Sequence, residues 1–279
     1  MLKRITRVFV YSNLFIALCA VVMSYQTYHV VLKIPADWNL LGFIFFSTIC
    51  SYSFHWYLTS HSEIPSDRIA WVNRNRWVHG MLFFVGLVGA LAGFLILIRH
   101  WFWLSASAMV TFLYSAPKIP HPFFRALRRV AIGKTIFLAI VWMYVTAILP
   151  VIVAESPWHE DTILFAISRF FLVYAICILF DYRDREDDRV AGIRSMVTWF
   201  GDKGIGRLFF LSLVIFLVST LAMAWYGYTA WQIGLLVVPG ILVGLLYNTA
   251  RRFFDDLFFY LLLDGLMMLS GLLMILTGN

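Results

Sequence analysis

The chain alternates between long apolar runs and short polar connections from one end to the other. Nine runs have the length and composition to cross about 30 Å of hydrocarbon as an α-helix. The fourth is short and opens with Trp101 and Trp103, which are typical of a membrane interface. The pattern predicts an all-α, polytopic membrane protein, a nine-helix bundle with a single domain over residues 1–279. The predicted spans are 8–29, 38–58, 78–98, 101–116, 131–153, 162–180, 207–227, 229–249 and 256–276.

Composition excludes a water-soluble globular protein. Apolar residues make up 62% of the chain and charged residues only 13%, whereas charged residues are about 25% of an average soluble protein. The mean hydropathy is +0.83. The chain is therefore expected to be an integral multi-pass membrane protein.

Basic residues are divided very unequally between the two sides of the predicted bundle. Nineteen Lys and Arg residues lie on the side that holds the amino terminus, whereas the other side has only Lys33 and Arg99. Because positive residues are retained in the cytoplasm, the amino terminus is predicted inside and Asn279 outside, in an inner or plasma membrane. Topology and attraction to anionic membrane lipid account for the net charge of +7, and no nucleic-acid partner is needed.

A cluster of acidic and basic residues follows the sixth span. If the helix continues beyond the lipid, Asp181, Asp184 and Asp188 project from one face, and Asp187 points elsewhere. Three carboxylates on one face repel one another unless a cation neutralises them, and oxygen ligands suit Mg²⁺ shared with a phosphorylated substrate. The alternative is a solvated helix with ion pairs, because Arg183, Arg185 and Arg189 alternate with the acids.

A second polar stretch connects the fourth and fifth spans. Prolines end the fourth helix after Tyr114, and a basic run that includes Arg128 leads to Lys134 at the start of the fifth span. The basic residues suit lipid headgroups or a diphosphate. Lys134 differs from the others because it lies just inside an apolar segment, where a charge needs a partner or a water-filled cavity.

These stretches resemble the UbiA superfamily of intramembrane prenyltransferases, and the resemblance covers essentially the whole chain. It is carried by the second aspartate motif, Asp181-x2-Asp184-x3-Asp188 with Arg189-x-Ala191-Gly192-Ile193 and Phe200-Gly201, and by Tyr114-Ser115-x-Pro117 and Lys134.

The resemblance implies a helical bundle around a cavity in which Mg²⁺ bridges an isoprenoid diphosphate to two aspartate-rich loops. An allylic cation would then alkylate a lipophilic or aromatic acceptor. Asp181, Asp184 and Asp188 would hold the metal, and Lys134 and Arg128 would neutralise the departing diphosphate. The other expected substrate-binding residues are Tyr114, Arg189 and His55.

The first aspartate motif of the superfamily, Asn-Asp-x2-Asp-x3-Asp, is not present in recognisable form. One register places Glu63 and Asp67 at its acidic positions, as candidates for a second metal, and the other places Ser51 or His55 there. Fewer anionic ligands would bind this metal weakly or not at all. The chain is therefore expected to be a magnesium-dependent prenyltransferase or, alternatively, a catalytically inactive homologue that binds a lipid or a partner protein.

Two further observations bear on these alternatives. His55 is suited to bonding a diphosphate or accepting a proton, but a His among aromatic residues at a helix end is more often a packing residue. Arg169 and Asp264 are charged residues inside predicted spans; they are expected to pair with each other, and a proton or ion pathway is the alternative. A small transporter is disfavoured because the acids cluster at helix ends and not at the midplane.

Overall fold

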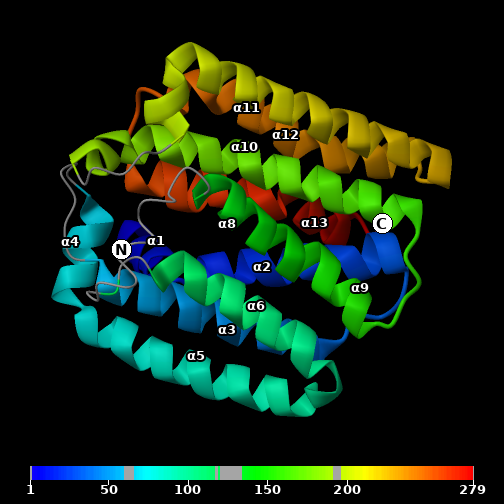
Figure 1. Ribbon diagram of the computed structural model, residues 1–279, viewed down its shortest axis with the longest axis horizontal. Coiled ribbons are helices and arrows are strands. Elements are labelled where there is room, and N and C mark those ends of the chain that lie inside the picture. The colour runs from blue at the N-terminus through cyan, green and yellow to red at the C-terminus, as the bar shows by residue number, and fades with distance from the viewer. Residues whose placement is uncertain (1, 60–65, 117–118, 120–133, 191–195, 279) are drawn as a thin grey trace.

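The structure is a computed structural model that describes residues 2–59, 66–116, 119, 134–190 and 196–278. Within these ranges, the side chains of Leu2, Lys134, residues 186–188 and residues 196–199 are outside the description. The described chain is a bundle of long helices, with no strand in these ranges (Figure 1). The all-helical prediction is confirmed to this extent.

The helices follow one another with short connections. In chain order they are α1 (Leu2–Tyr11), α2 (Leu14–Gln26), η1 (Thr27–Leu32), α3 (Trp38–Leu58), α4 (Asp67–Arg74), α5 (Arg76–Ile96), η2 (Ile98–His100), α6 (Trp101–Ser115), α8 (Lys134–Met143), η5 (Tyr144–Ile148), α9 (Leu149–Val153), α10 (Glu160–Val190), α11 (Met196–Ala222), η6 (Met223–Tyr226), α12 (Ala230–Ala250), η7 (Phe258–Leu263) and α13 (Asp264–Thr277).

Seven helical segments of the described chain are long and apolar enough to cross a membrane. The helices α3 and α6 are not among them, although both fall on predicted spans. The helix α6 has only 15 residues, and α3 carries Asn39, His55 and several hydroxyl residues that lower its hydropathy. A multi-pass membrane protein is supported, and the count of nine spans is not confirmed.

The first predicted span, 8–29, is divided by a corner. Asn13 has a φ of 68° between α1 and α2, a left-handed conformation that Asn tolerates better than most residues. Its buried side chain donates to Ser53 on α3 and accepts from Arg68 on α4. The apolar pattern alone could not reveal this break, because the residues that hold the corner come from later parts of the chain.

Two groups of helices form the bundle in Figure 1: α2, α3, α5 and α6 on one side, and α10, α11 and α12 on the other, with α8 and α13 between them. The helices α3 and α5 approach each other closely: a Cβ at Gly86 would lie 2.6 Å from the backbone nitrogen of Cys50. Only glycine permits this backbone-to-backbone contact. The helix α5 is mostly exposed along its apolar length, as expected for a helix that faces lipid.

The predicted pairing of Arg169 with Asp264 is wrong. The guanidinium of Arg169 is buried and donates to the hydroxyls of Ser270 and Ser168, at 2.9 and 3.0 Å. The charges that act on Asp264 instead belong to Arg68 and Arg183. Asp264 begins α13 and Ser270 lies six positions later, so the two sites are about 9 Å apart along that helix.

Several spans contain a π-helical turn, and η7 is the one that concerns the candidate site. It leads directly into α13 and contains Tyr260, whose ring is buried in the bundle. The helices α3, α6, α10 and α12 end, and α4, α8 and η7 begin, at one end of the bundle, on the left in Figure 1. This end, which carries Asp181 and Asp184, is called the acidic end below.

Candidate functional site

The second aspartate motif lies on the last turns of α10. This helix runs unbroken from Glu160 to Val190, so it continues past the end of the predicted span 162–180. Asp181 is 5% exposed, and its carboxylate accepts a hydrogen bond from the hydroxyl of Thr135 on α8. A buried carboxylate held by a hydroxyl is fixed in orientation, as a ligand or a charged binding group must be.

Asp184 lies nearly one turn further along α10 and forms an ion pair with its neighbour Arg183. The Nε atom of Arg183 donates to Oδ1 of Asp184 at 2.8 Å, and its Nη2 atom lies 2.7 Å from the same oxygen. The two side chains are only 13% and 28% exposed. The side chain of Asp188 lies outside the described residues.

Tyr260 connects this ion pair to a second buried arginine. The guanidinium carbons of Arg68 and Arg183 lie over its ring, 4.0 and 4.6 Å from the centroid. Arg68 is also 4.0 Å from the centroid of Trp56, a contact that contributes about 0.5 to 2 kcal/mol for a cation over an aromatic face. At the acidic end, therefore, the guanidinium groups of Arg68 and Arg183 both pack on the ring of Tyr260.

The segment around Arg68 is fixed from several sides. Arg68 is 3% exposed; its Nη2 donates to Asn13, and its backbone N–H donates to Asp256. Asp256 also accepts from the hydroxyl of Ser66, the N-cap of α4. Burial lowers the pKa of Arg68 from its usual value, and the charge of Arg183 lowers it further, whereas Tyr260, Asp264 and Asp256 act in the opposite direction.

His55 lies near the end of α3, beside the end of α6. Its Nδ1 is 3.3 Å from the hydroxyl of Ser115, and its ring stacks on Tyr114 with centroids 5.3 Å apart. The structure therefore brings together two of the predicted substrate-binding residues, His55 and Tyr114. Their neighbour Trp56 packs on Tyr260, which places this pair on the same side of the bundle as the two arginines.

The other predicted site residues are placed differently. Asp67 is 61% exposed and pairs with Arg7 at 2.6 Å, so it lies at the surface. Arg189 is exposed on the last turn of α10. Lys134 begins α8, one residue before the Thr135 that bonds Asp181, but its side chain is outside the described residues. Glu63 and Arg128 lie entirely outside them.

The donor set of α10 fits one magnesium better than two. Asp181 and Asp184 offer carboxylate oxygens about one turn apart, which is the donor chemistry that magnesium prefers. On the α4 side, Asp67 is turned to Arg7, and that side does not fit a second metal with the residues described. No group of three His, Cys, Asp or Glu side chains in the described part of the chain is close enough to hold a metal.

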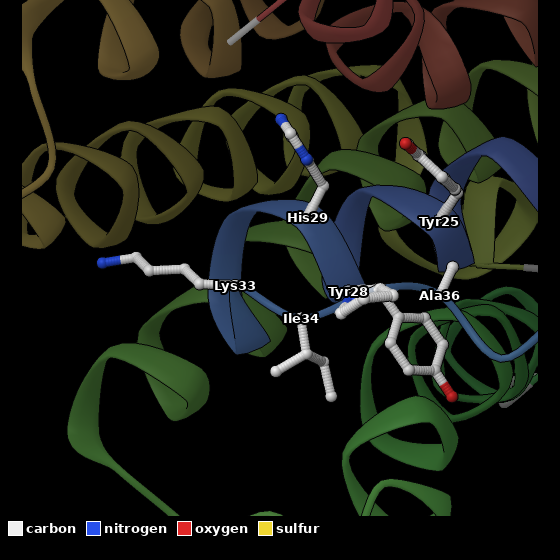
Figure 2. A pocket seen from close by; sticks show the side chains of 7 residues that line it. Tyr25, Tyr28, His29, Lys33, Ile34 and Ala36 are labelled. Atoms are coloured by element: carbon white, nitrogen blue, oxygen red, sulfur yellow. The ribbon is translucent and has the colours of Figure 1, made fainter.

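A hollow of about 380 Å³ lies elsewhere, where η1 passes into the connection to α3. Figure 2 shows Tyr25 and His29 on one side of the helix, and Tyr28 and Ile34 on the other. The hollow is near the start of α3 and His55 is near its end, so about 25 to 30 Å of helix separates them. The hollow is thus distinct from the acidic end.

The model of the UbiA prenyltransferase family matches residues 59–259. The chain belongs to the UbiA prenyltransferase family. Its fold is also similar to the apo structure of a UbiA homologue from Aeropyrum pernix K1, with a TM-score of 0.61 and 13% identity over 97% of this chain and 98% of that chain. Comparison with curated proteins gives no match. UbiA membership makes the protein, in general terms, a membrane prenyltransferase, and the resemblance noted in the sequence is confirmed.

Sequence reasoning did not identify Thr135, Tyr260 or the role of Arg183 in this UbiA site. The only signals were the position of Thr135 beside Lys134 and the position of Arg183 between two aspartates. Tyr260 gave no signal, because it is one aromatic residue among many in an apolar span.

Proposed function

We propose that this protein transfers an isoprenoid group from an allylic diphosphate to a lipophilic or aromatic acceptor, and that the reaction depends on Mg²⁺. The observation that carries the proposal is the buried Asp181 carboxylate, which Thr135 holds at the acidic end beside the start of α8. Membership of the UbiA family supports a membrane prenyltransferase. The donor set of α10 supports the metal.

The metal ligands would be Asp181 and Asp184, completed by Asp188. Bound there, magnesium would supply positive charge against the negative charge of the diphosphate. Lys134, at the start of α8, would add a second cation beside Asp181, and Arg128 and Arg189 would bind the outer phosphate oxygens. Of the two acids that the sequence pattern suggests for a second metal, Glu63 is retained as a candidate, whereas Asp67 is paired with Arg7.

The chemistry that these residues must support is simple in outline. The C–O bond of the allylic diphosphate breaks, and the bonding electrons leave with the diphosphate. The allylic cation then forms a bond to the acceptor, which loses a proton. Cationic side chains lower the barrier by stabilising the leaving group. The aromatic rings of Tyr114 and Trp56, which both pack on His55, would shield the allylic cation from water.

Purified protein in lipid, supplied with allylic diphosphates of several chain lengths and Mg²⁺, tests the proposal through release of diphosphate. We expect release in the wild type and none in the double variant Asp181→Asn/Asp184→Asn. Asp187→Asn is the matched control, since helical geometry turns residue 187 away from the direction of Asp181. Equal losses in Asp184→Asn and Asp187→Asn would favour a solvated acidic segment.

The altered first motif favours a second candidate function, that of a homologue which binds a lipid or partner without catalysis. Ligand binding without release of diphosphate above the level of the double variant would support this function and overturn the enzyme proposal. Restoring acids between Ser51 and Ser62 should accelerate any transfer, because a second metal would stabilise the leaving group further.

A further inference from the structure

The pair between Arg183 and Asp184 conflicts with the metal site proposed above. Two nitrogens of the guanidinium bind the same carboxylate oxygen of Asp184, and both side chains are largely shielded from water. A magnesium ion would need this carboxylate as a ligand. The guanidinium already occupies the position of a counter-cation, so metal and arginine compete for Asp184.

Three aromatic rings surround the guanidinium of Arg183, and these contacts do not depend on Asp184. Its guanidinium carbon lies 5.1, 5.2 and 4.6 Å from the ring centroids of Phe180, Phe259 and Tyr260. Its Nη1 is buried and has no hydrogen-bond partner among the described residues. The arginine therefore retains a donor for a further acceptor while the rings hold its position.

The charges around Arg183 indicate what the further acceptor is. Arg68 lies against the same Tyr260 ring, and the carboxylates of Asp256 and Asp264 are the other acids that act on this pair of guanidiniums. If Asp184 turned to a metal, Arg183 would lose its nearest counter-charge in a poorly solvated place, which is costly unless another anion replaces it. Phosphate oxygens match the geometry of a guanidinium.

We propose that Arg183 exchanges partners during binding: it holds Asp184 while the metal is absent, and it binds phosphate oxygens of the donor once Mg²⁺ has taken Asp184. The inference rests on the proposed magnesium site at Asp184. It adds a function for Arg183: the guanidinium neutralises Asp184 and keeps the affinity of the site for Mg²⁺ low until a diphosphate is present. Metal and diphosphate would therefore bind cooperatively.

Titration of purified protein with Mg²⁺ alone, without substrate, tests the first half of the exchange. We expect Arg183→Gln to bind the metal about tenfold more tightly than the wild type, because the competing cation is gone. Arg185→Gln is the matched control: Arg185 is a neighbouring arginine on α10, but it is half exposed and pairs with Asp202. A purely structural Arg183 would give unchanged or weaker metal binding in Arg183→Gln, which would overturn the proposal.

Titration with inorganic pyrophosphate at saturating Mg²⁺ tests the second half. We expect Arg183→Gln to bind pyrophosphate about tenfold more weakly than the wild type, and Arg185→Gln to be unchanged. Unchanged binding in Arg183→Gln would overturn the exchange. If Arg183→Gln does not fold, Arg183→Lys replaces it: a lysine keeps the charge but not the fork geometry, so weaker pyrophosphate binding is again expected, whereas the affinity for metal should change little.

The two proposals fail in distinguishable ways. If neither the wild type nor Arg183→Gln binds Mg²⁺, the proposed metal site does not exist. The proposed exchange would then be overturned as well. If Asp184→Asn abolishes Mg²⁺ binding but Arg183→Gln does not strengthen it, the metal site is supported. That result would overturn only the exchange of partners by Arg183.

Discussion

Thr135 shows how one hydroxyl sets the orientation of a charged group. It is the second residue of α8, and its Oγ1 donates to the buried carboxylate of Asp181 on α10. Without this donor, the carboxylate would lose one of the contacts that fix its orientation. Residues of this kind, which orient a ligand without touching the metal, are often nearly as important as the ligands.

Replacing Thr135 with Val, which has the same shape, should weaken Mg²⁺ binding by about tenfold or more. Thr135→Ser should retain most of the affinity, because it keeps the hydroxyl. Thr146→Val is the control: Thr146 is buried in the same span and bonds the carbonyl of Trp142, away from the carboxylates. Metal titration followed by isothermal calorimetry would check the prediction. Equal effects of Thr135→Val and Thr146→Val would show that the hydroxyl of Thr135 does not orient Asp181.

At the scale of single residues, the sequence predicted which residues belong to the site better than it predicted which residues they contact. The aspartates of α10 were recognised because spacing on one helix is a local property. For Arg183, in contrast, the alternation of acids and bases favours a solvated ion pair, whereas its guanidinium is covered by Phe259 and Tyr260 of η7. No local pattern encodes a contact between residues so far apart in the chain.

At the scale of the helix pair, α3 and α5 approach each other more closely than ordinary side chains allow. A Cβ at Gly86 would lie 2.6 and 2.8 Å from backbone atoms of Cys50 and Phe46. Backbone atoms cannot rotate away, so the helices would have to separate. Packing in lipid depends on such close contacts, because no hydrophobic effect drives one helix against another there.

We therefore expect Gly86→Ala to destabilise the protein by about 1 to 3 kcal/mol. Gly80→Ala on the same helix is the matched control, since nothing lies within 4 Å of the position of its added Cβ. That change should be neutral or slightly stabilising, because alanine favours helix by up to about 1 kcal/mol over glycine. Thermal unfolding in detergent measures both, and similar midpoints for the two variants would contradict the close approach.

At the scale of the whole molecule, the apolar pattern predicted the positions of the long helices well, although the count of nine membrane spans is not confirmed. The second predicted span, 38–58, coincides with α3, and most of the others differ from the helices by a few residues at the ends. The bilayer explains this success, since only helices of sufficient length satisfy their backbone in hydrocarbon. The apolar pattern did not predict the corner at Asn13, because its partners Ser53 and Arg68 are brought there only by folding.

The orientation of the bundle follows from the distribution of basic residues and remains to be tested. We expect Arg252→Cys, just after α12 at the acidic end, to be protected in intact cells from an impermeant thiol reagent. His159→Cys, between α9 and α10 at the opposite end, should react. Both positions are exposed, and the native cysteines Cys19 and Cys177 are buried. Labelling of residue 252 but not 159 would reverse the predicted topology.

The π-helical turn η7 makes the bundle sensitive to chain length at one place. A π-helix contains about one residue more per turn than an α-helix and is frequently found at functional sites. Deleting Leu261 should let residues 258–263 close into an ordinary α-helical turn while α13 keeps its packing. The preceding residues would rotate by about 100°, carrying the Tyr260 ring away from Arg68 and Arg183.

Such a protein should elute as a folded species but lose affinity for pyrophosphate. The same deletion at Leu269, within the regular turns of α13, should prevent folding.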